Sequence, residues 1–130
     1  MTARRFPLVL LIAFWACGAN EPSDPCPSLN VTVTRAPDPV FDWSTTCAVG
    51  ALDVTPSDST GRFLWTVLAN PGENSILSPV TYGIAPEGTA VMVPADPLIP
   101  GREYRVHLRR ATGPGGLGLE LVGEADFTVP

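Results

Sequence analysis

The chain has 130 residues, and the part that follows its apolar start, roughly 100 residues, is enough for one domain with a single core. Eight arginines, no lysine and thirteen acidic residues give a net charge of −5. This balance argues against a nucleic-acid-binding protein, because counterion release requires clustered basic side chains facing phosphate. Fifteen prolines and twelve glycines, in a chain that is 45% hydrophobic, predict a packed domain with many turns.

The first segment has the pattern of a secretory signal peptide. Arg4 and Arg5 precede an apolar run over 6–16, which is about half the length that a membrane-spanning helix needs. A basic start, a short apolar middle and small residues after it are typical of a leader that is removed on export. We therefore expect the chain to leave the cytoplasm.

The residues Phe-Trp-Ala-Cys at 14–17 resemble the lipobox of bacterial lipoproteins. In that family a diacylglyceryl group is attached to the cysteine thiol, and the leader is removed just before it. The resemblance implies a signal peptide over 1–16, lipid on Cys17, and a Pro/Ser/Asp-rich tether over 17–29 that holds the protein at a membrane of the cell envelope. Ordinary cleavage after Ala19 is the alternative, and it would give a periplasmic or secreted protein.

The three cysteines fit this interpretation. An odd thiol in an exported protein needs an explanation, and lipid on Cys17 would supply one. Cys26 and Cys47 are then free to form a disulfide, which closes a loop of about 20 residues and stabilises the fold by ~3 kcal/mol. A metal site is not expected, because no CxxC spacing and only one histidine are present. No cofactor is expected either.

From residue 30 onward the apolar residues recur with a period of two, as in β-strands. Eight such segments are bounded by Pro, Gly and polar turns, at 30–35, 40–44, 50–54, 62–68, 80–84, 89–94, 102–110 and 119–129. Seven or eight short strands predict an all-β fold, an antiparallel two-sheet sandwich over 30–130 with Greek-key connections. The first two segments form a predicted hairpin in which Val33 pairs with Phe41, which brings Cys26 near Cys47.

The stretch PLIPGREYRVHL, at 97–108, resembles the penultimate-strand pattern of fibronectin type III domains. In that family and its immunoglobulin-like relatives, a tyrosine packs at a corner and its hydroxyl bonds back to nearby backbone. The resemblance implies this role for Tyr104, and it implies that Trp43 is the core tryptophan of an early strand. It covers roughly residues 30 to 130 and indicates architecture rather than function.

One strand carries a stripe of basic side chains. His107 alternates with Arg105 and Arg109, so all three are predicted to face outward into solvent. A hairpin turn centred on the Pro-Gly pair at 114–115 would place Arg109 opposite Glu120 and Arg105 opposite Glu124. We expect the stripe to be neutralised across this hairpin rather than to bind an anionic polymer.

No motif indicates catalysis. His107 has no nucleophile or metal-ligand context, and the carboxylate pairs Asp38/Asp42 and Glu124/Asp126 are more typical of solvating side chains than of a glycosidase. The glycine-rich stretch 113–118 precedes no helical pattern, so it indicates a turn rather than a phosphate-binding loop. We expect no catalytic residue and no small-molecule substrate.

The resulting expectation is a non-enzymatic cell-envelope lipoprotein whose sandwich binds a protein or polysaccharide through loops or an edge strand. A structural spacer or accessory subunit without its own ligand is the first alternative. A small secreted enzyme is the second.

Overall fold

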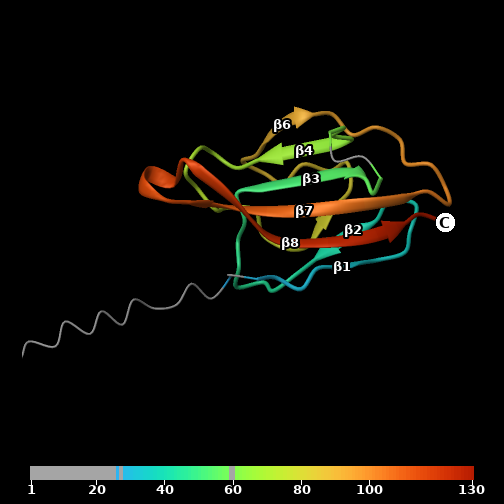
Figure 1. Cartoon of the computed structure of the whole chain (residues 1–130), viewed down its shortest axis with the longest axis horizontal. Helices are drawn as coiled ribbons and strands as arrows, with labels where there is room; N and C mark the ends of the chain where they lie inside the picture. The colour runs from blue at the N-terminus through green and yellow to red at the C-terminus, as the bar shows by residue number, and fades with distance from the viewer. Residues whose placement is uncertain (1–25, 27, 59–60) are drawn as a thin grey trace, which may run out of the picture.

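Two antiparallel sheets pack face to face in the computed structural model, which describes residues 26, 28–58 and 61–130 (Figure 1). The three-stranded sheet has the order β1-β2-β5, with β1 at Thr32–Val33, β2 at Val40–Asp42 and β5 at Val80–Thr81. The five-stranded sheet has the order β6-β4-β3-β7-β8, with β6 at Ala90–Val93, β4 at Trp65–Leu68, β3 at Ala51–Pro56, β7 at Glu103–Thr112 and β8 at Gly118–Thr128. The predicted all-β, two-sheet sandwich is confirmed.

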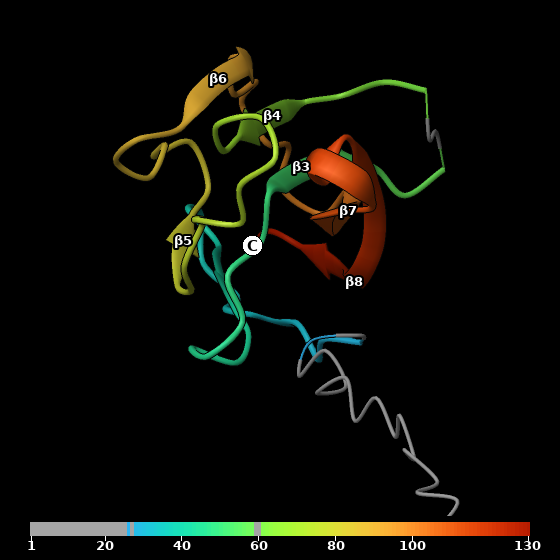
Figure 2. The same ribbon diagram turned by 90° about the vertical axis from the view of Figure 1, so that its left-hand side faces the viewer.

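Each of the eight predicted segments overlaps one of these strands, although β3 and β7 extend two residues further than predicted and β8 begins one residue earlier. The predicted pairing of Val33 with Phe41 is also correct, and Thr32 lies opposite Asp42 in the same register. The turn between the strands carries Pro37 and Pro39, which fix φ and remove backbone donors, so β1 and β2 stay short. Figure 2 shows the five-stranded sheet curving from β6 to β8, with β5 on its inner side.

The core fills the space between the sheets. Alternate residues of the long strands point into it, as the period of two dictates. The fully buried members include Phe41, Leu52, Val54, Trp65, Val67, Val106 and Leu108. Two edge-to-face ring contacts, Phe41 with Phe127 and Trp65 with Tyr82, have centroid distances of 5.3 Å and join the two layers. Such pairs contribute about 0.5–1.5 kcal/mol each beyond the apolar area that they bury.

The predicted register of the β7–β8 hairpin is wrong. Arg105 lies opposite Asp126 rather than Glu124, and Arg109 lies opposite Leu121 rather than Glu120. Two features cause the shift. The connection over 113–117 contains a short 3-10 turn, η1 (Pro114–Gly116), so the hairpin turn is longer than a two-residue turn. A bulge between Leu108 and Arg109 then displaces the pairing by one residue.

The two ends of the sandwich differ. The end that carries η1 is called the hairpin end below. The described start of the chain lies toward this end, though not at the hairpin tip, because the backbone N–H of Leu29 donates to the carbonyl of Val122, the fifth of the eleven residues of β8 (2.6 Å) (Figure 1). The C-terminus lies at the opposite end, where the N–H of Gly101 donates to the carbonyl of Val129 (2.9 Å). The domain therefore begins and finishes at different ends of the sandwich.

Candidate functional site

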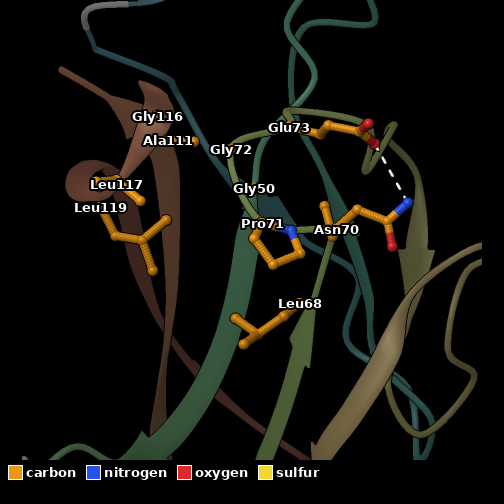
Figure 3. Close-up of a pocket in the computed structure, with 11 residues that line it drawn as sticks. Gly50, Leu68, Asn70, Pro71, Gly72, Glu73, Ala111, Gly116, Leu117 and Leu119 are labelled. Carbon is orange, nitrogen blue, oxygen red and sulfur yellow. Dashed lines mark hydrogen bonds between the residues drawn. The ribbon is translucent and has the colours of Figure 1, made fainter. Parts of the chain in front are cut away.

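An apolar groove of about 220 Å³ opens at the hairpin end (Figure 3). One wall is the tip of the β7–β8 hairpin, and the other is the turn that follows β4. Its lining comprises Gly50, Leu68, Ala69, Asn70, Pro71, Gly72, Glu73, Ala111, Gly116, Leu117 and Leu119. Leu117 and Leu119 stand on the hairpin side, facing Leu68 and Pro71 across the groove. The groove joins segments that are far apart in the sequence, one before Asn74 and the other from Ala111 onward.

Two glycines hold the walls together. A Cβ atom at Gly116 would lie 2.6 Å from the Cα atom and 2.7 Å from the carbonyl oxygen of Gly72. Real Cβ atoms do not approach backbone this closely, so the two turns can touch only because both residues lack side chains. Both also have positive φ, +79° at Gly72 and +66° at Gly116. The hairpin tip is therefore seated directly on the neighbouring turn.

Asn74 provides a second connection between the walls. Its Oδ1 accepts a hydrogen bond from the N–H of Ala111 (2.7 Å), and its Nδ2 donates to the carbonyl of the same residue (3.2 Å). The amide thus pairs with the end of β7 as another strand residue would. Gly50 leaves room for it, since a Cβ atom there would lie 3.1 Å from Asn74 Oδ1 and 3.2 Å from Ala111 N. This arrangement fixes the base of the groove.

The hairpin tip presents leucines to solvent. Leu117, Leu119 and Leu121, together called the leucine face, are 88%, 50% and 46% exposed. Leu119 pairs with Ala111 on this face, while Glu120 and Arg110 pair on the opposite face of the hairpin. The tip of the hairpin is therefore amphipathic, with Leu119 and Ala111 on one side and Arg110 and Glu120 on the other; further along, Leu121 lies opposite Arg109, whose charge is paired with Asp53. Isolated exposed leucines are ordinary on a protein surface, whereas these three gather beside an apolar groove.

The groove is lined mainly by apolar side chains and glycines. Glu73 is its one ionisable lining residue, and its carboxylate accepts a hydrogen bond from Asn70 (3.4 Å). Elsewhere, the buried Tyr82 hydroxyl donates to the carbonyl of Asp96 (2.6 Å), and burial raises the pKa of Tyr82 to about 12. Within the described ranges, no three His, Cys, Asp or Glu side chains are placed to share a metal ion. The groove is suited to holding an apolar group rather than to transforming one.

Those residues predicted from the sequence that the structure describes do not line this groove. Cys17 lies outside the described residues, as do the predicted leader and most of the tether. Cys26 and Cys47 form a disulfide beside the three-stranded sheet. Trp43 is buried, and its indole N–H donates to the carbonyl of Cys47 (2.7 Å). Tyr104 is also buried, and its hydroxyl accepts a hydrogen bond from the N–H of Ile99 (2.8 Å).

The basic stripe is neutralised, but by other partners than predicted. The guanidinium of Arg105 binds both carboxylate oxygens of Asp126, at 2.6 and 3.2 Å, across the hairpin. This pairing lowers the pKa of Asp126 and raises that of Arg105. Arg109 instead forms an ion pair with the buried Asp53 of β3, on the other side of β7. The stripe offers no excess of positive charge for an anionic polymer.

His107 is not solvent-facing, which corrects the prediction made for it. It lies on the same face as Arg105 and Arg109 but is only 8% exposed. β7 is an interior strand between β3 and β8, so neighbouring side chains cover the ring. Its Nε2 lies 3.9 Å from a carboxylate oxygen of Glu124. Burial lowers the pKa of His107, although the nearby carboxylate acts in the opposite direction.

A second exposed feature is the edge formed by β6. This strand pairs only with β4, and Val91 and Met92 are exposed on it. The other edge of the sheet, at β8, is partly covered by the segment that contains Leu29. Edge strands offer unpaired backbone groups to a strand of another chain. β6 is short and is followed by Pro94, which limits such pairing to a few residues.

Comparisons with family models, curated proteins and solved structures find no match to this chain. Among the described residues, no helix is long and apolar enough to cross a membrane.

The sequence interpretation missed the groove and the leucine face. The signal was present in GLGLEL at 116–121, where leucines alternate at 117, 119 and 121. The stretch 113–118 was assigned only to a turn, and the alternation just after it was assigned to a strand. The contact between Gly72 and Gly116 has no local signal, because it depends on the packing of two distant turns.

Proposed function

We propose that this chain is an exported, lipid-anchored protein of the bacterial cell envelope that binds another protein and catalyses no reaction. The observation that supports lipid attachment at Cys17 is the disulfide between Cys26 and Cys47. That bond accounts for two of the three cysteines, and it leaves Cys17, at the end of the apolar run, as the cysteine available for lipid. Both the lipobox resemblance at 14–17 and the disulfide of the domain therefore support lipid attachment at Cys17.

The fibronectin type III or immunoglobulin-like kinship belongs to the same proposal. The hydroxyl of Tyr104 bonds to backbone five residues upstream, as the corner tyrosine of that family does. Trp43, which immediately follows β2, is buried in the core. These two residues support the kinship, while the Cys26–Cys47 bond is a departure from most type III domains.

Metabolic labelling with a fatty-acid analogue tests the anchor. The full chain should be labelled, and the Cys17→Ala variant should not. A matched control replaces Cys26 and Cys47 with serine and keeps Cys17, so it should still take up label. A wild-type chain without label and with Asn20 at its N-terminus would instead establish ordinary cleavage and contradict the anchor.

A protein partner is better supported than a polysaccharide. Stacking on a sugar ring needs an exposed aromatic face, and among the described residues only Phe63, 44% exposed, offers one, whereas the tryptophan and tyrosine rings are buried. The free edge at β6 offers backbone groups and the apolar side chains of Val91 and Met92, which suit the addition of a partner's strand. The sandwich would then act by pairing its edge with another envelope protein.

Site-specific photo-crosslinking in cells tests this edge. A photoreactive residue at Met92 should give one protein product, and Val91→Lys, which places a charge on the edge, should abolish it. Leu77 is the matched control, because its exposure, 58%, equals that of Met92, 59%, while it lies outside the β6 edge. If photoreactive residues at Met92 and Leu77 gave the same crosslinked proteins, or if Met92 gave none, the alternative of a spacer without a ligand would be favoured.

A further inference from the structure

The described start of the chain lies beside the leucine face. Ser28 and Leu29 border a shallow hollow together with Leu121, and Leu29 is hydrogen-bonded to β8 at Val122. Cys26, three residues earlier, is fixed by its disulfide. The described chain therefore begins beside β8, where Leu29 and the exposed Leu121 border the same hollow.

A lipid on Cys17 would hold this end close to the membrane. Cys17 precedes Cys26 by nine residues, which reach at most about 30 Å even when fully extended. A tether this short keeps the hairpin end at a high effective concentration near the bilayer. This step rests on the lipid anchor proposed above.

The leucine face has the properties of a surface that contacts lipid. Its three leucines project from a hairpin whose tip is seated on Gly72, so they are held outward instead of folding back. The charged pair of Arg110 and Glu120 lies on the opposite face of the hairpin, and Arg109, which lies opposite Leu121, is held by its ion pair with Asp53. Such an amphipathic arrangement suits the boundary between headgroups and acyl chains, where apolar side chains are buried and charges stay in water.

We propose that the hairpin end docks on the lipid bilayer, with Leu117, Leu119 and Leu121 inserted at the interface and the groove beside them facing the lipid. The driving force is apolar, because Glu73 and Glu120 are the acidic neighbours of this surface and would not attract anionic headgroups. Leucine insertion and the Cys17 lipid act together as two weak membrane signals. The β6 edge is left free for a partner protein.

Quenching by brominated lipid tests the docking. The full lipidated chain is reconstituted in vesicles of brominated phosphatidylcholine, with Leu119→Trp or Leu117→Trp as the reporter. The matched control is Ile99→Trp, because Ile99 is 51% exposed, as Leu119 is 50%, but lies at the C-terminal end. Trp43 and Trp65 are buried and provide the same background in every variant. Brominated lipid should quench the fluorescence of a tryptophan introduced at position 117 or 119, and it should not quench a tryptophan introduced at position 99.

A second set of variants measures the apolar contribution. Replacing Leu117 and Leu121 with serine in the Leu119→Trp chain should lower the ratio of docked to undocked protein by about tenfold. Equal quenching at 119 and 99 would mean that the domain tumbles on its tether, and it would overturn the docking. Absent quenching in a chain that still carries fatty-acid label would overturn the docking and leave the anchor intact. A photoreactive group at Leu119 that captures protein in place of lipid would overturn it as well.

Discussion

Replacing Gly116 with alanine should release the hairpin tip from the turn that supports it. The new Cβ atom would lie 2.6 Å from the Cα atom of Gly72, and backbone on both sides leaves no flexible side chain to move away. The residue also has φ of +66°, where an L-residue costs about 1–2 kcal/mol. Overpacking of this kind adds about 1–3 kcal/mol. We therefore expect the free energy of unfolding to fall by about 3 kcal/mol.

Gly115→Ala is the matched control for this change. Its φ is +69°, almost the same as that of Gly116, but the nearest atom to its added Cβ is Leu117 Cγ at 3.9 Å. It should therefore cost only the left-handed conformation, about 1–2 kcal/mol. Both variants restrict the unfolded chain equally, so that contribution cancels in the comparison.

Urea unfolding followed by the emission of the buried Trp43 and Trp65 measures both variants. Hydrogen exchange at Gly72 and Glu73 gives a local readout, and protection there should fall in Gly116→Ala only. Equal losses of stability in the two alanine variants would refute the reasoning, because the contact between the two turns would then contribute nothing measurable.

Three further predictions concern the interior. Arg109→Met should cost about 3 kcal/mol in urea unfolding, because it leaves the buried carboxylate of Asp53 unpaired; a negligible loss would contradict that pairing. Removing both Cys26 and Cys47 opens a loop with a sequence separation of 21 and should cost about 3 kcal/mol, unless thiol titration finds them already reduced. His107 has a pKa below its usual 6.5, so stability should be complete above about pH 6.5 and fall at lower pH, and His107→Gln should flatten that fall.

The sequence predicted those features of the fold that depend on local patterns. Period-two alternation located all eight strands, and the prolines between the first two strands set a hairpin whose register pairs Val33 with Phe41. These features follow from side-chain direction and turn chemistry within a few residues. Local patterns also indicated the sandwich, because no segment has helical spacing.

The features that were not predicted depend on contacts between distant segments. The β7–β8 register shifted because the glycines around η1 permit a longer turn, and the bulge at Leu108 permits one more displacement. The burial of His107 depends on the strands that flank β7, which its own alternation does not reveal. The groove requires Gly72 and Gly116 to meet, and nothing near either glycine indicates the other.

The distribution of charge explains why a contact with the membrane would have to be apolar. Arg105 and Arg109 are both paired with carboxylates, and Arg110 lies opposite Glu120, so the arginines of β7 do not form a basic surface that would attract anionic lipid. The net charge of −5 would oppose such attraction at any distance within a Debye length. Orientation then depends on apolar area at one end and on a short tether at the same end. Neither feature alone would orient the domain. A few half-exposed leucines bind a bilayer weakly, and a tether limits the distance to the membrane without choosing which end of the domain faces it. Together they would fix which end of the sandwich faces the bilayer.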